Sequence, residues 1–233
     1  MNDNIELSII MPCLDEAGTV EVCVKKAKKF LEVNKISGEV IVVDNRSADD
    51  SANVAKNAGA KIILASERGY GNALREGLKS ASGKYIITGD ADDTYDFSAL
   101  SQFLEKLRAG SDIVIGNRFR GEIKKEAMPF LHRYFGNPAI TWFGNFLFGY
   151  ICGDFYCGLR GFKREKILEI ELIDDGIQSA VEVLIKGKLK GFKIGEVPTI
   201  LYPALSGRRS KLSRWKDGAK TMLLFLKLKW HCF

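Results

Sequence analysis

Short apolar runs alternate with segments of helical periodicity over the first half of the chain. Strands are expected at residues 7–11, 39–44, 61–65, 84–89 and 112–116, where apolar residues run almost unbroken. Helices are expected between them, at residues 16–30, 51–58, 71–80 and 97–107. Since strands that alternate with helices usually build a mainly parallel sheet covered on both faces, the pattern predicts an α/β fold.

The alternation becomes irregular after Asn117. A glycine-rich strand or turn is expected at residues 153–162, a helix near 180–190 and a strand near 192–201. No low-complexity linker or internal repeat divides the 233 residues, of which 46% are hydrophobic. We therefore expect one large domain at residues 1–212, followed by a basic amphipathic helix at residues 213–233.

Two segments bear on membranes. Residues 134–153 carry no charge, but Asn137, Pro138 and several glycines make them a poor transmembrane helix, and their aromatic residues indicate an interface. Residues 215–233 mix leucines and Phe225 with lysines, which is typical of a helix that lies on a membrane surface. An ordinary packed helix is the alternative for both segments.

The net charge of the chain limits the classes of binding partner. A net charge of +6 favours an anionic partner, which can be a nucleotide, a nucleic acid or an acidic membrane surface. No nucleic-acid recognition motif is present, so we expect no nucleic-acid partner. Five cysteines without a C-x-x-C pair indicate neither a disulfide framework nor a zinc site, and the acidic N-terminus lacks the features of a signal peptide. The chain is therefore expected to face the cytoplasm.

The chemistry is concentrated after the strand expected at residues 84–89. Asp90, Asp92 and Asp93 place three carboxylates within four positions, where they repel one another. Mg²⁺ or Mn²⁺ would relieve that repulsion, taking one or two carboxylates while bridging the phosphates of a substrate. The alternative is an acidic turn without a metal, because Asp is common in turns after strands. Neither the G-x-G-x-x-G pattern nor the G-x-x-x-x-G-K-[ST] phosphate loop occurs, which disfavours a dehydrogenase or a P-loop enzyme.

Five motifs in order resemble the family 2 glycosyltransferases, in the branch of dolichyl-phosphate mannose synthase and the bacterial polyprenyl-phosphate glycosyltransferases. They are Ile9-Ile10-Met11-Pro12-Cys13-Leu14-Asp15-Glu16, Val42-Val43-Asp44-Asn45-Arg46-Ser47, Gly69-Tyr70-Gly71-Asn72-Ala73, Gly89-Asp90-Ala91-Asp92 and Gly116-Asn117-Arg118-Phe119. The resemblance spans residues 5–220. It implies a GT-A fold, which is Rossmann-like, and a nucleotide-sugar donor whose sugar is transferred with inversion.

The same resemblance implies roles for individual residues. Asp90 and Asp92 would hold the metal, and the donor would be bound by Pro12, Leu14, Glu16, Asp44, Ser47, Asp90 and Ala91. Arg118 and Arg133 would reach phosphate, and a guanidinium suits this because it holds two phosphate oxygens at once. Glu182 would take part in sugar selection. Arg208 and Lys211 would contact the diphosphate from a basic loop.

Asp154 matches the acceptor-side turn of the family and would face the reacting sugar. It is a candidate base, although a phosphate monoester, with a second pKa near about 6, is already an anionic nucleophile at neutral pH. We count Asp92, Asp154 and Arg118 as the catalytic candidates.

The sequence thus predicts a metal-dependent enzyme that moves a hexose from a UDP- or GDP-sugar to a polyprenyl phosphate at the cytoplasmic face of a membrane. The protein would dock peripherally or be a truncated form of an integral membrane protein, and a homo-oligomer is compatible with this function. One alternative is a soluble family 2 glycosyltransferase that acts on a saccharide or protein. A non-catalytic scaffold that binds nucleotide sugars is the other.

Overall fold

A seven-stranded sheet forms the centre of the protein. The structure, a computed structural model, describes residues 5–204 and 214–230. Along the sheet the strands follow the order β3-β2-β1-β4-β6-β5-β7. Their bounds are β1 Leu7–Cys13, β2 Gly38–Asp44, β3 Lys61–Leu64, β4 Tyr85–Thr88, β5 Ile113–Ile123, β6 Arg160–Lys163 and β7 Ile194–Leu201.

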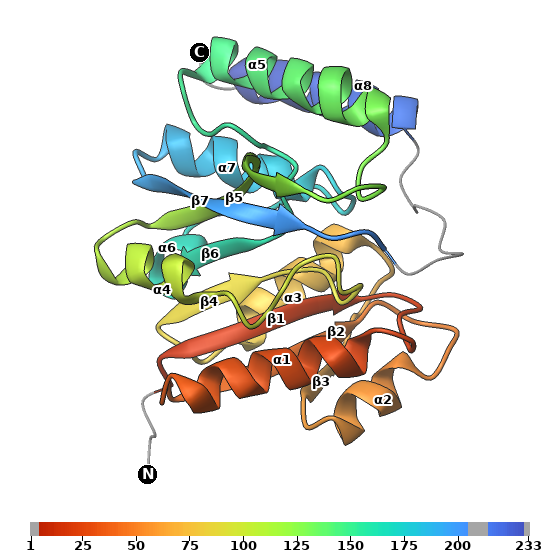
Figure 1. The fold of residues 1–233 in the computed structure, drawn as a ribbon. Coiled ribbons are helices and arrows are strands. Elements are labelled where there is room, and N and C mark those ends of the chain that lie inside the picture. Colours follow the sequence, from red (N-terminus) through yellow and green to blue (C-terminus); the bar gives the residue numbers. More distant parts are fainter. Residues whose placement is uncertain (1–4, 205–213, 231–233) are drawn as a thin grey trace.

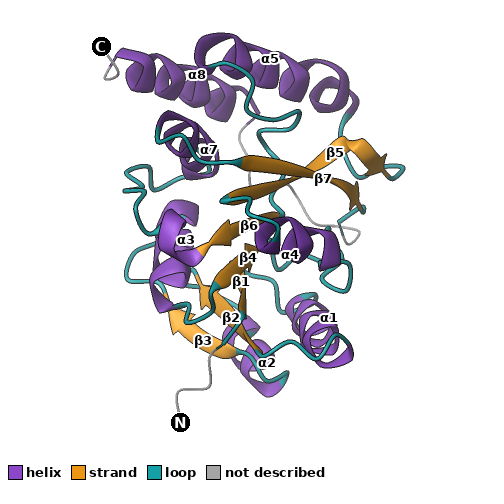
Figure 2. Cartoon of the chain, turned by 90° about the vertical axis from the view of Figure 1, so that its left-hand side faces the viewer, coloured by secondary structure: helices purple, strands orange, loops and turns teal. Residues whose placement is uncertain are grey.

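Helices cover both faces of this sheet (Figure 1). Figure 2 shows α3 and α7 on one side, with α1 and α4 on the other. The helical elements are α1 Val20–Val33, α2 Ser51–Asn57, α3 Tyr70–Ser80, α4 Ser101–Arg108, η1 His132–Gly136, α5 Asn137–Phe148, α6 Arg164–Ile167, α7 Ser179–Leu189 and α8 Arg214–Trp230. The predicted α/β architecture is confirmed.

The pairing of the strands brings the predicted motifs to one edge. β1 pairs in parallel with β2 and with β4, so that Cys13 lies beside Asp44 and Ile10 beside Thr88. The loops that follow these three strands therefore leave the sheet close together. β5 and β7 are also parallel, whereas β6 runs antiparallel to both β4 and β5. The antiparallel β6 carries the chain that follows the Asp154 turn into the middle of the sheet.

Two predicted helices begin later than expected. The helix predicted from residue 16 begins at Val20, and the one predicted from residue 97 begins at Ser101. At the second, the Asp96 carboxylate accepts hydrogen bonds from the backbone N–H and the hydroxyl of Ser98. These hydrogen bonds stabilise a turn at Asp96 instead of the first turn of a helix. Asp side chains often compete with helix formation in this way.

The aromatic segment and the C-terminal helix form a separate layer. Figure 1 shows α5 and α8 side by side at one end of the molecule, far from β3 and α2. Phe225 of α8 is fully buried, and its ring lies 6.0 to 6.2 Å from the rings of Phe143, Phe148 and Phe155. In the described ranges, no helix has both the length and the apolar character needed to cross a membrane.

We expect Phe225→Ala to lower the free energy of unfolding by about 3–5 kcal/mol, because it removes the ring that joins α8 to α5 and leaves a cavity. Leu223→Ala is the control, since that side chain is 66% exposed and its loss should change stability by less than about 0.5 kcal/mol. Urea denaturation measures both. Equal stabilities for the two variants would contradict the packing of α8.

Candidate active site

The acidic turn after β4 separates its three carboxylates. Asp93 adopts a left-handed conformation with φ of 58° and accepts a hydrogen bond from Lys26 Nζ at 2.7 Å. Asp92 accepts from the backbone N–H and the hydroxyl of Thr94 through a single oxygen, Oδ1. Asp90 and Asp92 are both partly exposed. The turn therefore directs Asp93 toward α1 and holds Asp92 in a defined orientation.

Asp90 and Asp92 share a neighbour, Tyr70, at the start of α3. Burial raises the pKa of the Tyr70 hydroxyl well above its ordinary value, and the charges of Asp90 and Asp92 raise it further. Both carboxylates thus act on one hydroxyl, which indicates that they face the same region. The sequence places Tyr70 in the Gly69-Tyr70-Gly71-Asn72-Ala73 motif, but its position beside Asp90 and Asp92 was not predicted.

Gly158 lies in close contact with the Asp90 carboxylate. A Cβ atom at this position would lie 2.7 Å from Asp90 Oδ2, so a side chain there would displace the carboxylate. The Gly158 N–H donates to the hydroxyl of Tyr95 at 3.0 Å. Burial raises the pKa of Tyr95, and Cys157, Arg118 and Asp90 all act on it electrostatically. Tyr95 therefore connects the acidic turn to Gly158, in the turn that begins at Asp154.

Arg118 and Asp154 form a buried ion pair. Arg118 Nε donates to Asp154 Oδ2 at 2.6 Å and Nη2 donates to Oδ1 at 2.8 Å, while the Arg118 backbone N–H also donates to Oδ2 at 3.2 Å. Arg118 is 7% exposed and Asp154 is fully buried. Nη1 of Arg118 takes no part in the pair. The Asp154 carboxylate is thus committed to holding the guanidinium.

The ends of β1 and β2 bring four of the predicted donor-binding residues together in one wall. Pro12, Glu16 and Asp44 are buried, and Leu14 is partly exposed beside them at the end of β1. Asp44 is 6% exposed, and its carboxylate accepts from the Ser47 N–H at 3.2 Å. The structure thus brings together four of the residues expected to bind the base and ribose.

Reciprocal hydrogen bonds join the loop after β1 to the loop after β2, and we call this pair of bonds the clasp. The Asp15 N–H donates to Ser47 Oγ at 3.0 Å, and the Ala48 N–H donates back to Asp15 Oδ1 at 2.7 Å. The Glu16 N–H donates to Ser51 Oγ at 2.7 Å. The Ser47 hydroxyl thus accepts a hydrogen bond that joins the two loops, and its predicted contact with the donor stays a prediction.

Three other candidates, Glu182, Ala91 and Arg133, have hydrogen-bond partners within the protein, and their predicted roles stay predictions. The buried Glu182 accepts from the backbone N–H groups of Ile173 and Asp174 and pairs with Lys186, so it secures the loop before α7. The Ala91 carbonyl accepts from the Thr19 hydroxyl at 2.8 Å. Arg133 lies in η1, where it donates to the Ile123 carbonyl and stacks on Tyr134. A sequence motif does not reveal these contacts.

Arg208 and Lys211 lie outside the described residues. Their predicted contact with the diphosphate stays a prediction.

The Asp154 turn also contacts α8. The Tyr156 hydroxyl lies 2.6 Å from the hydroxyl of the buried Thr221, and Phe155 packs against Phe225. Gln178, just before α7, donates to the Asp217 carbonyl at 3.3 Å. The layer of α5 and α8 is thus joined directly to the turn that holds Arg118.

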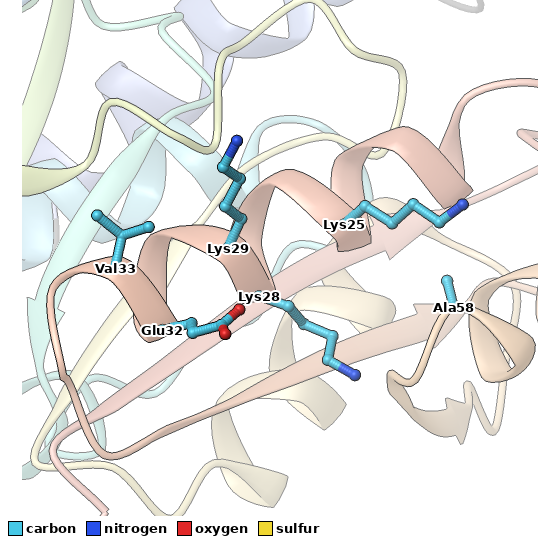
Figure 3. Close-up of a pocket in the computed structure, with 6 residues that line it drawn as sticks. All are labelled: Lys25, Lys28, Lys29, Glu32, Val33 and Ala58. Carbon is cyan, nitrogen blue, oxygen red and sulfur yellow. The ribbon is translucent and has the colours of Figure 1, made fainter.

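The surface depression in Figure 3 is separate from this site. It has a volume of about 650 Å³ and is lined by Lys25, Lys28, Lys29, Glu32, Val33 and Ala58. These residues come from α1 and from the end of α2, and none of the site candidates lines it.

Residues 8–171 match the family described as Glycosyl transferase family 2. The chain is 36% identical over 213 residues to the Low-salt glycan biosynthesis hexosyltransferase Agl6 of Haloferax volcanii. That match covers 91% of this chain and 51% of Agl6, so the chain spans about half the length of this relative. A Dolichyl-phosphate hexose transferase of the same organism is 35% identical over 181 residues, covering 78% of this chain and 76% of the relative.

The fold is similar to that of glucosyl-3-phosphoglycerate synthase from Mycobacterium tuberculosis. Its structure in complex with Mn²⁺, UDP and glucosyl-3-phosphoglycerate gives a TM-score of 0.76 at 17% identity, covering 96% of this chain and 79% of that one. At this identity the similarity establishes the fold, and the expected GT-A architecture is confirmed.

We expect Asp154→Asn to lower the free energy of unfolding by about 3–5 kcal/mol, because it leaves the Arg118 guanidinium buried without a counter-charge. Replacing both partners, Arg118→Met with Asp154→Leu, should recover most of that loss, since apolar residues need no compensating charge. Urea denaturation at neutral pH tests this. A single variant as stable as the wild type would show that the pair is solvated.

Proposed function

The chain belongs to glycosyl transferase family 2, and we propose that it transfers a hexose from a UDP- or GDP-sugar to a polyprenyl phosphate. The proposal rests on one observation above all. Asp90 lies against Gly158, in the same turn whose Asp154 holds Arg118, so a diphosphate on the acidic pair and an acceptor phosphate on Arg118 can be bound side by side. The names of the relatives from Haloferax volcanii point to the same class of reaction.

Asp90 and Asp92 suit a divalent cation. The described ranges hold no cluster of three or more His, Cys, Asp or Glu side chains able to bind a metal. Mg²⁺ commonly uses only one or two carboxylates and completes its shell with water and substrate phosphates. Bound there, Mg²⁺ or Mn²⁺ would neutralise charge on the nucleoside diphosphate. The hydrogen bonds from Thr94 keep Asp92 in place for this task.

The donor base and ribose are assigned to the wall formed by Pro12, Leu14, Glu16 and Asp44. The clasp between the loops after β1 and β2 fixes this wall before a ligand arrives, which reduces the entropy lost on binding. A carboxylate such as Asp44 accepts hydrogen bonds from base or ribose donors. Arg208 and Lys211 are proposed to contact the diphosphate from the basic loop.

The burial of Asp154 favours a phosphate acceptor. A saccharide or protein hydroxyl needs a base within hydrogen-bond reach, whereas the Asp154 carboxylate is fully buried and bonded to Arg118. A phosphate monoester, with a second pKa near about 6, needs no such base. We therefore assign Arg118 to the acceptor phosphate, with Nη1 as the donor, and Asp154 to holding Arg118. This weighs against the soluble enzyme that glycosylates hydroxyl groups.

The exposed face of α5 and α8 is proposed to lie on the membrane that supplies the lipid. Trp142 and Phe146 stack one turn apart on α5 and are 66% and 71% exposed. On α8 an exposed stripe of Leu223, Leu226 and Trp230 follows helical spacing. Exposed aromatic and leucine side chains next to lysines are typical of helices at an anionic membrane surface. We place the protein at the cytoplasmic face of that membrane.

Transfer should depend on Asp92 and on a divalent cation. Incubating the protein with radiolabelled nucleotide sugars, polyprenyl phosphate and Mg²⁺ or Mn²⁺ should yield a labelled lipid, and chelator should abolish it. Asp92→Asn should lower the rate by at least about a hundredfold, since it weakens the stabilisation of the leaving diphosphate.

The control for this experiment is Asp93→Asn. Asp93 pairs with Lys26, so this variant should keep most of the activity. Equal loss in both variants would contradict the assignment of Asp92. Transfer to soluble sugars but not to polyprenyl phosphate would select the alternative function, and an absence of turnover with every acceptor would favour a scaffold.

Membrane binding should depend on the exposed apolar face. The wild type should co-sediment with anionic phospholipid vesicles at low salt, and Trp142→Ala with Phe146→Ala should weaken this binding by at least about tenfold through lost apolar burial. Val33→Ala on α1 is the control, because Val33 is 68% exposed but lies outside this face. Unchanged sedimentation of the double variant would exclude this surface.

A further inference from the structure

Glu196 is an acidic residue within the edge strand β7, and three hydrogen-bond donors converge on it. The Tyr150 hydroxyl donates to Oε1 at 2.5 Å. Asn117 Nδ2 and the Gly153 N–H donate to Oε2 at 2.6 and 3.0 Å. These donors come from the segment after α5, from β5 and from the turn before β6. A single carboxylate thus joins three separate parts of the chain.

Two of these donors directly precede the residues of the buried ion pair. Asn117 precedes Arg118 in β5, and Gly153 precedes Asp154. Glu196 Oε2 therefore fixes the spacing between the two backbones that carry Arg118 and Asp154. The fit at this point is close, since a Cβ atom on Gly153 would lie 2.4 Å from Asn117 Nδ2.

Asn117 extends the same constraint along β5. Its Oδ1 atom accepts from the backbone N–H groups of Phe119 and Arg120, each at 3.0 Å. These bonds lie where the register of β5 and β7 shifts, between Asn117 and Glu122. An irregularity of this kind re-aims the side chains beside it. The orientation of Arg118 thus depends on the amide of Asn117, which Glu196 holds.

We propose that Glu196 is a positioning residue that sets the orientation of the Arg118 guanidinium toward the acceptor phosphate, acting through Asn117 and Gly153. The assignment of Arg118 to that phosphate is taken from the proposed function. Glu196 itself touches no reacting atom.

The negative charge strengthens this arrangement. The two oxygens of the carboxylate accept from all three donors, whereas a glutamine would keep one oxygen for Asn117 and Gly153, turn its NH₂ group toward the Tyr150 hydroxyl and lose the charge that strengthens all three hydrogen bonds. Burial alone would raise the pKa of Glu196, but hydrogen bonds from Tyr150, Asn117 and Gly153 outweigh it and lower the pKa below the ordinary glutamate value. The side chain is therefore ionised at neutral pH, as three donors require.

The test compares Glu196→Gln with Glu122→Gln, the same chemical change at an exposed position of β5. We expect Glu196→Gln to lower kcat/KM for the polyprenyl phosphate by at least about tenfold, the size of a lost hydrogen bond to a charged group, and to leave the KM of the nucleotide sugar within about twofold. In an Arg118→Lys background the same substitution should cost less than about twofold. Equal losses in both backgrounds would overturn the proposal.

A second measurement does not need turnover. In protein labelled with ¹⁵N-arginine, the Nε–H signal that disappears in Arg118→Lys belongs to Arg118. This signal should shift in Glu196→Gln and stay in place in Glu122→Gln. An unmoved signal overturns the proposal whatever the enzyme does. If the wild type transfers no sugar while the signal shifts, the proposed function fails and the positioning by Glu196 stands.

If Glu196→Gln does not fold, Asn117→Ala takes its place, because it removes the same link from the other side. It should give the same kinetic pattern and the same movement of the Arg118 signal. A folded Asn117→Ala protein with wild-type kinetics and an unmoved signal would overturn the proposal.

Discussion

The burial of a charged pair, Arg118 with Asp154, is the constraint on which the site depends. Removing two charges from water costs several kcal/mol per ion, and the cost is offset only when geometry and additional hydrogen bonds are good. Here two parallel bonds join guanidinium and carboxylate, and the Arg118 backbone adds a third. Since the pair must stay intact, the turn that begins at Asp154 cannot move independently of β5.

That fixed turn organises the neighbouring parts of the site. Gly158, at its far end, lies against Asp90, so the position of the acidic pair follows from the position of the turn. Tyr95 also holds this turn in place, because its hydroxyl accepts a hydrogen bond from the Gly158 N–H. The proposed donor and acceptor phosphates would therefore be held at a set separation, which is how enzymes gain rate from orientation.

The turn that begins at Asp154 also packs against the layer of α5 and α8. Tyr156 and Phe155 contact Thr221 and Phe225 of α8, and Glu196 accepts a hydrogen bond from Tyr150, which follows α5. The helices proposed to lie on the membrane are thus packed on the segment that positions Arg118.

The sequence by itself determined the α/β succession and the motifs at the strand ends. Unbroken apolar runs such as Val40–Val43 can only be buried, and the carboxyl ends of parallel neighbours meet at one edge, so Asp44 and the Asp90–Asp92 turn were predicted together. Only the tertiary structure decided the antiparallel β6, whose four residues are too few to show a period. It also decided which carboxylates are hydrogen-bonded within the protein. Glu182, Glu196 and Asp154 are chemically alike in sequence, but their hydrogen bonds come in part from donors that lie up to 79 positions away along the chain.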